Sequence, residues 1–464
     1  MKIYNSLTQK KEEFIPLNPP QVKMYACGIT VSAEAHLGHF LQAMIFDIIR
    51  KYLEKKGYNV TYARNYTDID DKIIASANRL GVNSADYAES MIKKIDEQMD
   101  KLQVGQPNLW LKATKNVDNI INFVQKLIDS GHAYKTENGD VYFSVETFSG
   151  YGKLSNRNIK DALNGVRIDN DENKKSPLDF ALWKSAKPGE PFWESPWGKG
   201  RPGWHIECSA MNMAAFGEQI DIHGGGRDLV FPHHENEIAQ TESLTGKQFA
   251  KYWVHNGLIK VNGQKMSKSL SNGITLGELL DSYHVETLKF AMLQTNYHND
   301  INITPEFFPE AQKHMERFHR LIAEVEEKFG KGQADLSSEI ETNFNNAMDD
   351  DFNTARAIAD LFGYFKNIQE KLSKNDKTAA NDVATIKKVF GLLGLFVNSS
   401  KEFLEFKSKK EQQQIPAEVK KLAEERWSAK QNRDWATADS LRAKLDGLGY
   451  IIKDSKDGFE IAKK

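Results

Sequence analysis

The N-terminal part of the chain alternates strand-like and helix-like stretches, and this alternation restricts the fold more than any other feature of the sequence. Residues 23–28 form a short strand-like run, residues 36–56 have the periodicity of an amphipathic helix, and residues 59–65 form a second strand-like run. Strand, crossover helix and strand make the βαβ unit of a parallel sheet, whose ligand crevice lies at the carboxyl ends of the strands. We therefore predict an α/β fold with residues 27–30 at such an end.

The rest of the chain predicts further domains, because 464 residues exceed one core at roughly 150 residues per domain. In residues 114–201 a helix is followed by turn-rich, mixed sequence, which indicates an inserted domain. Sheet-like sequence resumes over residues 203–273, so the first domain is split. Beyond it, helical patterns predict an antiparallel bundle, then a polar linker, and from Pro416 two helices and a hairpin with its turn at Asp457-Gly458.

Composition excludes several classes of protein. The longest apolar run, residues 389–397, has roughly nine residues against the roughly 20 that span a bilayer, so we expect no membrane helix. The N-terminus lacks the apolar core of a signal peptide, which indicates a cytoplasmic protein. Because the net charge is −2, a nucleic-acid partner must be bound by local basic patches. The two cysteines are too few for a disulfide framework.

A metal site is indicated by His233 and Glu237, which are four residues apart on one face of a helix that Pro232 begins. Zinc takes nitrogen, oxygen and sulfur ligands in tetrahedral geometry, and the only cysteines, Cys27 and Cys208, could complete the set. The alternative is a solvated helical pair together with two buried, unreactive cysteines. Spacing alone favours that alternative.

Two segments have the residues of phosphate-binding sites. His36 and His39 flank a glycine at a helix N-terminus, where imidazoles, free N–H groups and the helix dipole can meet phosphate oxygens. Residues 265–273 form a small polar loop in which Lys265 and Lys268 could close over a triphosphate. The alternative for this loop is an ordinary exposed connection.

A third segment, residues 221–228, contains three consecutive glycines followed by an acidic residue. Glycines such as Gly226 allow the backbone to approach a planar or phosphorylated ligand, and Asp228 could accept hydrogen bonds from ribose hydroxyls. A simple glycine-rich turn before a helix is the alternative.

Taken in order and over the whole length, these segments resemble the cysteinyl-tRNA synthetases, a family of class I aminoacyl-tRNA synthetases. The resemblance extends beyond the histidine pair, the glycine turn, the His/Glu helix and the lysine loop to residues 24–31, 65–72, 200–211, 348–354 and 433–439.

The resemblance implies a Rossmann-like catalytic domain, split by an insertion, then a stem-contact region, a helical bundle and a small C-terminal α+β anticodon-binding module. The corresponding boundaries are 1–113 and 202–273 for the catalytic domain, 114–201 for the inserted connective domain, 274–315 for the stem-contact region, 316–398 for the bundle, 399–415 for the linker and 416–464 for the anticodon-binding module.

The resemblance also implies one zinc ion per chain, bound by Cys27, Cys208, His233 and Glu237, with the thiolate of the substrate L-cysteine joining the metal. A soft thiolate binds zinc far better than a serine hydroxyl, so ligation can reject serine without an editing site. Residues that would line the amino-acid pocket are Gly28, Thr30, Thr67 and Trp204. Trp204 could instead belong to the core.

For the nucleotide, the resemblance implies that His36 and His39 bind ATP phosphates and that Asp228 binds the ribose beside Gly226. Lys265 and Lys268 would stabilise the charge that develops as the cysteine carboxylate attacks the α-phosphate and Mg²⁺-bound pyrophosphate leaves.

The acceptor implied is the tRNA for cysteine, and we expect a monomeric ligase. Arg433, Trp435 and Asp439 are candidates for base stacking or recognition of base edges in that tRNA. A helical residue such as Trp435 could equally lie in a core.

Departures from the family pattern leave alternatives open. Ser32-Ala33 replace Tyr followed by Asp or Asn, Leu41 replaces an arginine after the second histidine, and Arg227 replaces a serine in the glycine turn. We expect these positions beside the crevice. A paralogue that transfers activated cysteine to a small-molecule amine, or a noncatalytic zinc- and RNA-binding paralogue, is therefore an alternative to the cysteine–tRNA ligase.

Overall fold

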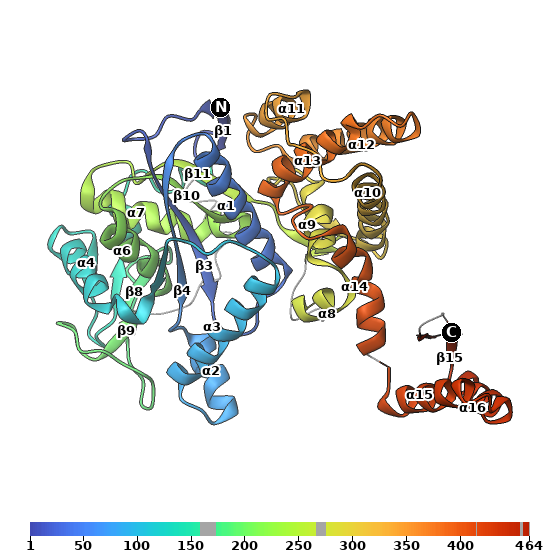
Figure 1. The fold of residues 1–464 in the computed structure, drawn as a ribbon. Coiled ribbons are helices and arrows are strands. Elements are labelled where there is room, and N and C mark those ends of the chain that lie inside the picture. Colours follow the sequence, from blue (N-terminus) through green and yellow to red (C-terminus); the bar gives the residue numbers. More distant parts are fainter. Residues whose placement is uncertain (158–172, 266–274, 414, 455–457, 464) are drawn as a thin grey trace.

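The computed structural model describes residues 1–157, 173–265, 275–413, 415–454 and 458–463. At its centre lies a five-stranded sheet whose neighbouring strands are all parallel, in the order β11-β10-β3-β4-β5 (Figure 1). The predicted Rossmann-like parallel sheet is confirmed. Its strands are β3 (Gln21–Thr30), β4 (Asn59–Thr67), β5 (Leu109–Lys112), β10 (Ile220–Gly226) and β11 (Ala250–Asn256).

Helix α1 (Leu37–Lys55) is the predicted crossover between β3 and β4, and it lies between the sheet and the helical bundle (Figure 1). His36 caps its N-terminus by accepting a hydrogen bond from the N–H of Gly38 at 3.1 Å. Most of the helix is buried, because one side packs on β4, β10 and β11 while another meets the bundle. Helices α2 (Asp71–Leu80) and α3 (Ser84–Lys101) follow β4.

The predicted insertion contains α4 (Val117–Asp129) and an antiparallel sheet in the order β6-β7-β8-β9. Its apolar core is continuous with residues of the catalytic domain, namely Ile206 and Ala210 of α6 (Trp204–Phe216) and Ala239 of α7 (Glu235–Thr245). The insertion therefore packs directly on α6 and α7, which carry two of the four predicted metal ligands, Cys208 and Glu237. The four strands are Ala133–Lys135, Val141–Phe143, Phe180–Ser185 and Gly200–Pro202.

The region from residue 275 to 413 is mostly helical, as the pattern indicates, but it contains one strand. β14 (Ile301–Ile303) pairs in parallel with β12 (Ile259–Val261), and β12 pairs with β13 (Gln264–Lys265). This small sheet joins the segment around β14 to the strands that follow β11. The helices are α8 (Leu276–Ser282), α9 (Val285–Leu293), α10 (Phe307–Phe329), α11 (Glu339–Met348), α12 (Thr354–Ser373), α13 (Thr378–Phe390) and α14 (Ser400–Gln413).

Helix α14 corrects the prediction of a linker at residues 399–415. It packs along α10, and the buried ring of Phe403 stacks on His319 with 4.0 Å between ring centroids. The polar composition concealed this helix, in which Ser400 and Phe403 are buried among the side chains that the structure describes.

A hairpin formed by β1 (Lys2–Asn5) and β2 (Lys10–Glu13) is fastened to the bundle by Asp351. The buried Asp351 carboxylate accepts hydrogen bonds from the backbone N–H of Tyr4 at 2.8 Å and from the hydroxyl of Tyr297 at 2.9 Å. Its second oxygen lies 2.9 Å from Nε2 of His298. One carboxylate thus joins the N-terminus, the segment before β14 and the bundle.

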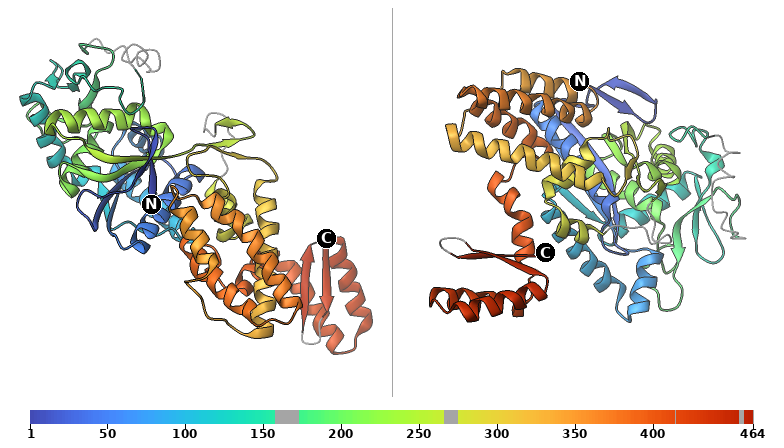
Figure 2. Two further views of the ribbon diagram at one scale, coloured as in Figure 1. Left: turned by 90° about the horizontal axis from the view of Figure 1, so that it is seen from above. Right: turned by 90° about the vertical axis from the view of Figure 1, so that its right-hand side faces the viewer.

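The C-terminal module lies beyond α14, apart from the parallel sheet in Figure 1, and its last strand contacts α14 (Figures 1 and 2). It consists of α15 (Ala417–Gln431), α16 (Trp435–Gly447) and a hairpin of β15 (Tyr450–Asp454) and β16 (Phe459–Lys463), as predicted. The expected turn residue Asp457 lies outside the described residues. Among the described helices, none is both long and apolar enough to cross a bilayer.

An ion pair stabilises this module. The almost fully buried Arg426 of α15 donates to both carboxylate oxygens of Asp454 in β15, at 2.7 and 2.9 Å. This contact holds the pKa of Asp454 well below its usual value of 3.8. Because folding lowers the pKa of Asp454, the ion pair contributes its full stabilisation at neutral pH. This stabilisation decreases as the pH falls below the ordinary pKa of the carboxyl group.

We predict that Arg426→Met destabilises the module by roughly 2 kcal/mol, because it leaves a partly buried carboxylate without its main partner. Relative to the wild type, hydrogen exchange at pH 7 will then become faster in α15 and β15 but not in the parallel sheet. Lys430→Met is the matched control, since this more exposed lysine also contacts Asp454, at 2.7 Å, and should contribute less than about 1 kcal/mol. Unchanged exchange in Arg426→Met would contradict the prediction.

Candidate active site

A cavity of about 480 Å³ opens at the carboxyl ends of β3, β4 and β10, where a parallel sheet forms its ligand crevice. Most of the predicted site residues line it, from segments far apart in the sequence. They are Cys27, Gly28, Thr30, His36, His39, Thr67, Trp204, Cys208, Gly226, Asp228 and His233.

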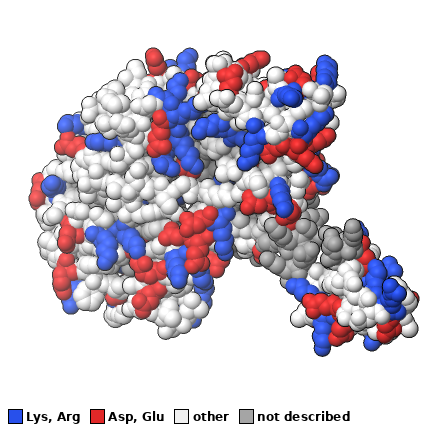
Figure 3. All heavy atoms as spheres, viewed as in Figure 1, with Lys and Arg blue, Asp and Glu red and all other residues white. Residues whose placement is uncertain are grey.

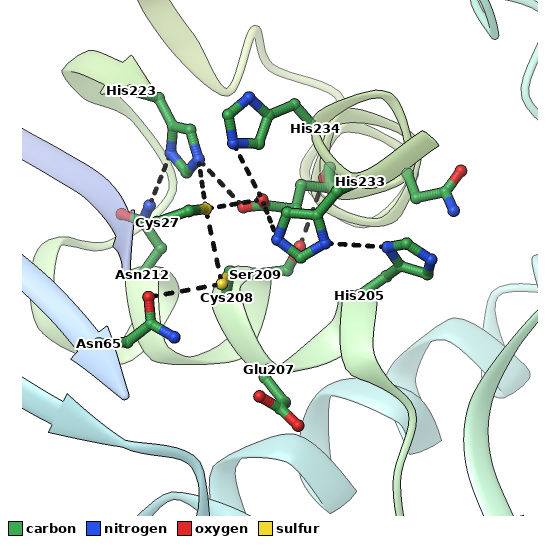
Figure 4. Close-up of polar contacts among 12 residues, drawn as sticks. Cys27, Asn65, His205, Glu207, Cys208, Ser209, Asn212, His223, His233 and His234 are labelled. Carbon is green, nitrogen blue, oxygen red and sulfur yellow. Dashed lines mark hydrogen bonds and ion pairs between the residues drawn. The ribbon is translucent and has the colours of Figure 1, made fainter. Parts of the chain in front are cut away.

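The four predicted metal ligands are brought together at the base of this cavity (Figure 4). Sγ of Cys27 lies 3.6 Å from Sγ of Cys208 and 3.2 Å from Oε1 of Glu237. Nε2 of His233 lies 3.1 Å from the same Oε1. All four side chains are buried, and their ligand atoms lie within 4.8 Å of one another. The alternative of a solvated helical pair is therefore wrong.

Local structure explains how each ligand is presented. The pairing of β3 with β4 is irregular between Ala26 and Ile29, which is where Cys27 leaves the strand ladder. Cys208 lies on α6 and Glu237 on α7. The prediction that Pro232 begins a regular helix is wrong. Pro232 lies in a π-helical turn, Val230–His234, that also carries His233 and precedes α7.

The electrostatics of the cluster favour a cation. Burial opposes the charge of Glu237, yet the imidazoles of His223 and His233 outweigh it and hold the carboxyl pKa well below its usual value. Likewise, burial opposes a charged His233, but Glu237 raises the imidazole pKa to about 10. The hydrogen bond from the Cys27 thiol lowers the pKa of Cys208 to about 6.

The donor set also fits a metal ion. Oε2 of Glu237 accepts no hydrogen bond from the described residues, although Nε2 of His223 is 3.2 Å away. Two thiols, an imidazole and a carboxylate in a dry environment match the ligands that zinc prefers. The buried cluster is therefore a group that could hold a metal ion.

Two further histidines belong to the site, and sequence reasoning missed them as ligand candidates. Cys27, His223, His234 and Glu237 also form a group that could hold a metal ion. The predicted group faces the cavity, because Cys208 and His233 line it. The two other histidines, His223 and His234, do not line it. His223 lies in the glycine-turn segment and His234 directly follows His233 in the sequence. Their closeness in sequence to predicted site residues is the one feature that could have indicated them as ligand candidates.

The part of the cavity beside β3 requires glycine at position 28. A Cβ atom there would lie 1.6 Å from the backbone oxygen of Asn65, and the side chain of Asn65 accepts a hydrogen bond from the N–H of Gly28 at 2.8 Å. Trp204 is 37% exposed and stacks on His233 with 4.3 Å between ring centroids. The core alternative for Trp204 is therefore wrong.

The paired histidines line the cavity at the start of α1. The rings of His36 and His39 stack with 3.7 Å between centroids at the N-terminus of α1. The side chain of Asp228 folds back over Gly226, where a Cβ atom would approach Oδ1 of Asp228 to 2.6 Å. Lys265 ends β13, while Lys268 lies outside the described residues.

The departures from the family pattern occupy different environments. Ser32 and Ala33 line the cavity as expected. The expectation for Leu41 is wrong, because its side chain is buried in the core. Arg227 does not line the cavity but forms an ion pair with Asp300 at 3.2 Å.

The predicted tRNA contacts lie far from this cavity, in the C-terminal module. Arg433, Trp435 and Asp439 are exposed at the connection between α15 and α16 and on the first turns of α16. Trp435 is 58% exposed, so the alternative that places it in a core is wrong.

Comparisons with known proteins agree with this architecture. The chain matches the model of the class I (C) tRNA synthetase catalytic domain over residues 13–313, the DALR domain over 343–397 and the cysteinyl-tRNA ligase anticodon-binding domain over 412–461. The structure of an Agrobacterium radiobacter leucyl-tRNA synthetase ternary complex has a TM-score of 0.61 at 11% identity, covering 85% of this chain and 86% of its own.

A Mycobacterium tuberculosis methionyl-tRNA synthetase has a TM-score of 0.58 at 13% identity, covering 84% of this chain and 94% of its own. Fold, cavity and family models together define a class I aminoacyl-tRNA synthetase. The cysteine–tRNA ligase of Thermodesulfovibrio yellowstonii is 45% identical over 479 residues, covering 98% of both chains, and that of Geotalea daltonii is 45% identical over 99% of this chain and 98% of its own. The chain belongs to the cysteine–tRNA ligase family.

We predict that Cys208→Ser and Glu237→Ala each lose most of the bound zinc, because each removes an anionic donor from a four-ligand site. Metal content of purified protein, measured by atomic emission, is the readout. Ser243→Ala, on the same helix as Glu237, should retain the wild-type content. Full zinc in both ligand variants would refute the ligand assignment.

Proposed function

We propose that this protein ligates L-cysteine to its cognate tRNA in an ATP-dependent reaction that passes through a cysteinyl-adenylate. The observation that carries this proposal is a dry Cys/Cys/His/Glu cluster that opens into the ligand crevice of a class I synthetase fold. The anticodon-binding model at residues 412–461 favours tRNA as the acceptor over a small-molecule amine.

The metal is proposed to be zinc, bound by Cys27, Cys208, His233 and Glu237. When bound, zinc supplies a soft Lewis acid that takes the thiolate of cysteine, which a serine hydroxyl replaces poorly. His205 supports this arrangement, since its Nδ1 lies 2.9 Å from Nδ1 of His233 and orients the ring. Gly28, Thr30, Thr67 and Trp204 surround the remainder of the amino acid.

The nucleotide is proposed to bind on the opposite side of the cavity. His36 and His39 contact phosphate oxygens at the start of α1, and Asp228 beside Gly226 binds the ribose. Lys265 and Lys268 stabilise the pyrophosphate that leaves with Mg²⁺. No general base is needed, because the attacking carboxylate of cysteine is already ionised at neutral pH.

For the tRNA, the exposed Arg433, Trp435 and Asp439 are proposed to contact unstacked bases. Lys and Arg side chains alternate with Asp and Glu over the face shown in Figure 3, so the surface has local basic groups rather than one continuous basic field. A cytoplasmic monomer is proposed as the working form.

The direct test of this function is cysteine-dependent ATP–pyrophosphate exchange on protein of known zinc content, with serine as the control. We expect robust exchange with cysteine and none with serine, because only the thiolate satisfies the metal. A folded, zinc-loaded protein without exchange would refute adenylation and favour the noncatalytic alternative.

We predict that Trp435→Ala raises the KM for tRNA in charging roughly 10-fold, since one base stack contributes about 1–3 kcal/mol. Pyrophosphate exchange will not change, because Trp435 is remote from the cavity. Leu448→Ala, at the opposite end of α16 and 49% exposed, is the control that should leave both activities unaltered. Unchanged charging by Trp435→Ala would count against this role of the residue.

A further inference from the structure

The proposed nucleotide side of the cavity has two walls that come from adjacent strands. One wall is the turn that follows β10 and includes Gly226, Asp228 and Leu229. The other is the segment from Asn256 to Ile259, at the end of β11 and the start of β12. Any change in their separation changes the space that the nucleotide would occupy.

One carboxylate outside the cavity contacts both walls. Arg227 lies between two lining residues, but its own side chain does not line the cavity. Its Nη1 atom lies 3.2 Å from Oδ1 of Asp300. The same Oδ1 accepts a hydrogen bond from the backbone N–H of Leu258 at 3.0 Å. Oδ2 of Asp300 lies 2.9 Å from Nζ of Lys260 in β12.

Asp300 is itself held in a fixed place. The next residue, Ile301, pairs with Ile259 in the β12–β14 ladder, and its N–H donates to the carbonyl of Leu258 at 2.9 Å. Before it, Tyr297 and His298 are bound to Asp351 of the bundle. The carboxylate is therefore a stationary anchor, not a mobile surface group.

From these contacts, and resting on the proposed ATP-dependent function, we propose that Asp300 with Arg227 forms a clamp that fixes the separation of the two nucleotide walls. Both are positioning residues, since neither lines the cavity. The clamp gives Arg227, a departure from the family pattern, a role in ATP affinity rather than in the chemical step. Lys260 neutralises the second oxygen of Asp300 and keeps the carboxylate ionised.

The test measures ATP affinity in Arg227→Ser, Arg227→Lys and Asp300→Ala, each in the full chain. We expect Arg227→Ser to raise the KM for ATP in pyrophosphate exchange about 2- to 5-fold, as for a half-exposed ion pair. Asp300→Ala, which loses a charge-assisted contact to each wall, should raise it roughly 10-fold. The kcat and the KM for cysteine should stay unchanged, and Arg227→Lys should restore most of the affinity.

Combining Arg227→Ser with Asp300→Ala should give no greater loss than Asp300→Ala alone, because both remove the same clamp. The control is Arg320→Ser, which breaks an exposed ion pair with Glu316 on α10 and should leave all constants unaltered. An ATP KM unchanged in Arg227→Ser, or a loss that falls on kcat instead, would overturn the proposal. If Asp300→Ala does not fold, the Arg227 variants, whose side chain is 46% exposed, still decide.

Calorimetric titration with ATP in the absence of cysteine separates this inference from the proposed function. A wild-type protein that binds ATP without exchange would refute the proposed ligase activity, while the same fold-changes in the ATP Kd of the variants would still support the clamp. Equal ATP Kd values in wild type, Arg227→Ser and Asp300→Ala would refute the clamp even in an active ligase.

Discussion

The carboxylate of Glu237, which has no access to water, is the group on which the architecture of the site depends. Burying an ionised carboxylate costs several kcal/mol unless opposite charge and hydrogen bonds compensate it. His233 and His223 supply part of this compensation from two different elements, and Cys27 donates to the same carboxylate. Ionisation of the two thiols would add further negative charge, which a metal ion held by this group would balance. This need explains why residues from β3, α6, β10 and the turn before α7 converge on one point.

Keeping this cluster dry is a task of the inserted segment. Its apolar core continues onto α6 and α7, and Tyr151 donates a hydrogen bond at 2.6 Å to Asn236, next to Glu237. The backbone N–H of Ser155 likewise donates to Glu235 at 2.8 Å. The insertion is therefore not an appendage of the catalytic domain. It packs on the helices that carry Cys208 and Glu237.

The helical part of the chain is attached to the catalytic domain through polar contacts as well as apolar ones. Asp351 binds Tyr4 in the N-terminal strand and Tyr297 before β14, and Tyr52 of α1 donates to Asp349 at 2.8 Å. These contacts fix the bundle, and with it the start of α14, relative to the cavity. The tRNA-binding module beyond α14 thus has a defined attachment, although its own core of Val419, Ala423, Leu445 and Ile452 is separate.

The sequence by itself determined the local elements and the chemistry of the donors. Hydrophobic periodicity predicted β3, α1 and β4, and the spacing of His233 and Glu237 predicted their contact, because both depend on neighbours along the chain. The resemblance of ordered motifs then identified Cys27 and Cys208 as their partners. Tertiary structure decided everything that depends on distant segments. Sheet order placed His223 against Glu237. Packing buried Leu41 but left Trp204 exposed. Packing along α10 accompanies the helix α14, where the polar sequence indicated a linker. The pairing of Arg227 with Asp300 belongs to the same class, since only the β12–β14 ladder brings these two residues together.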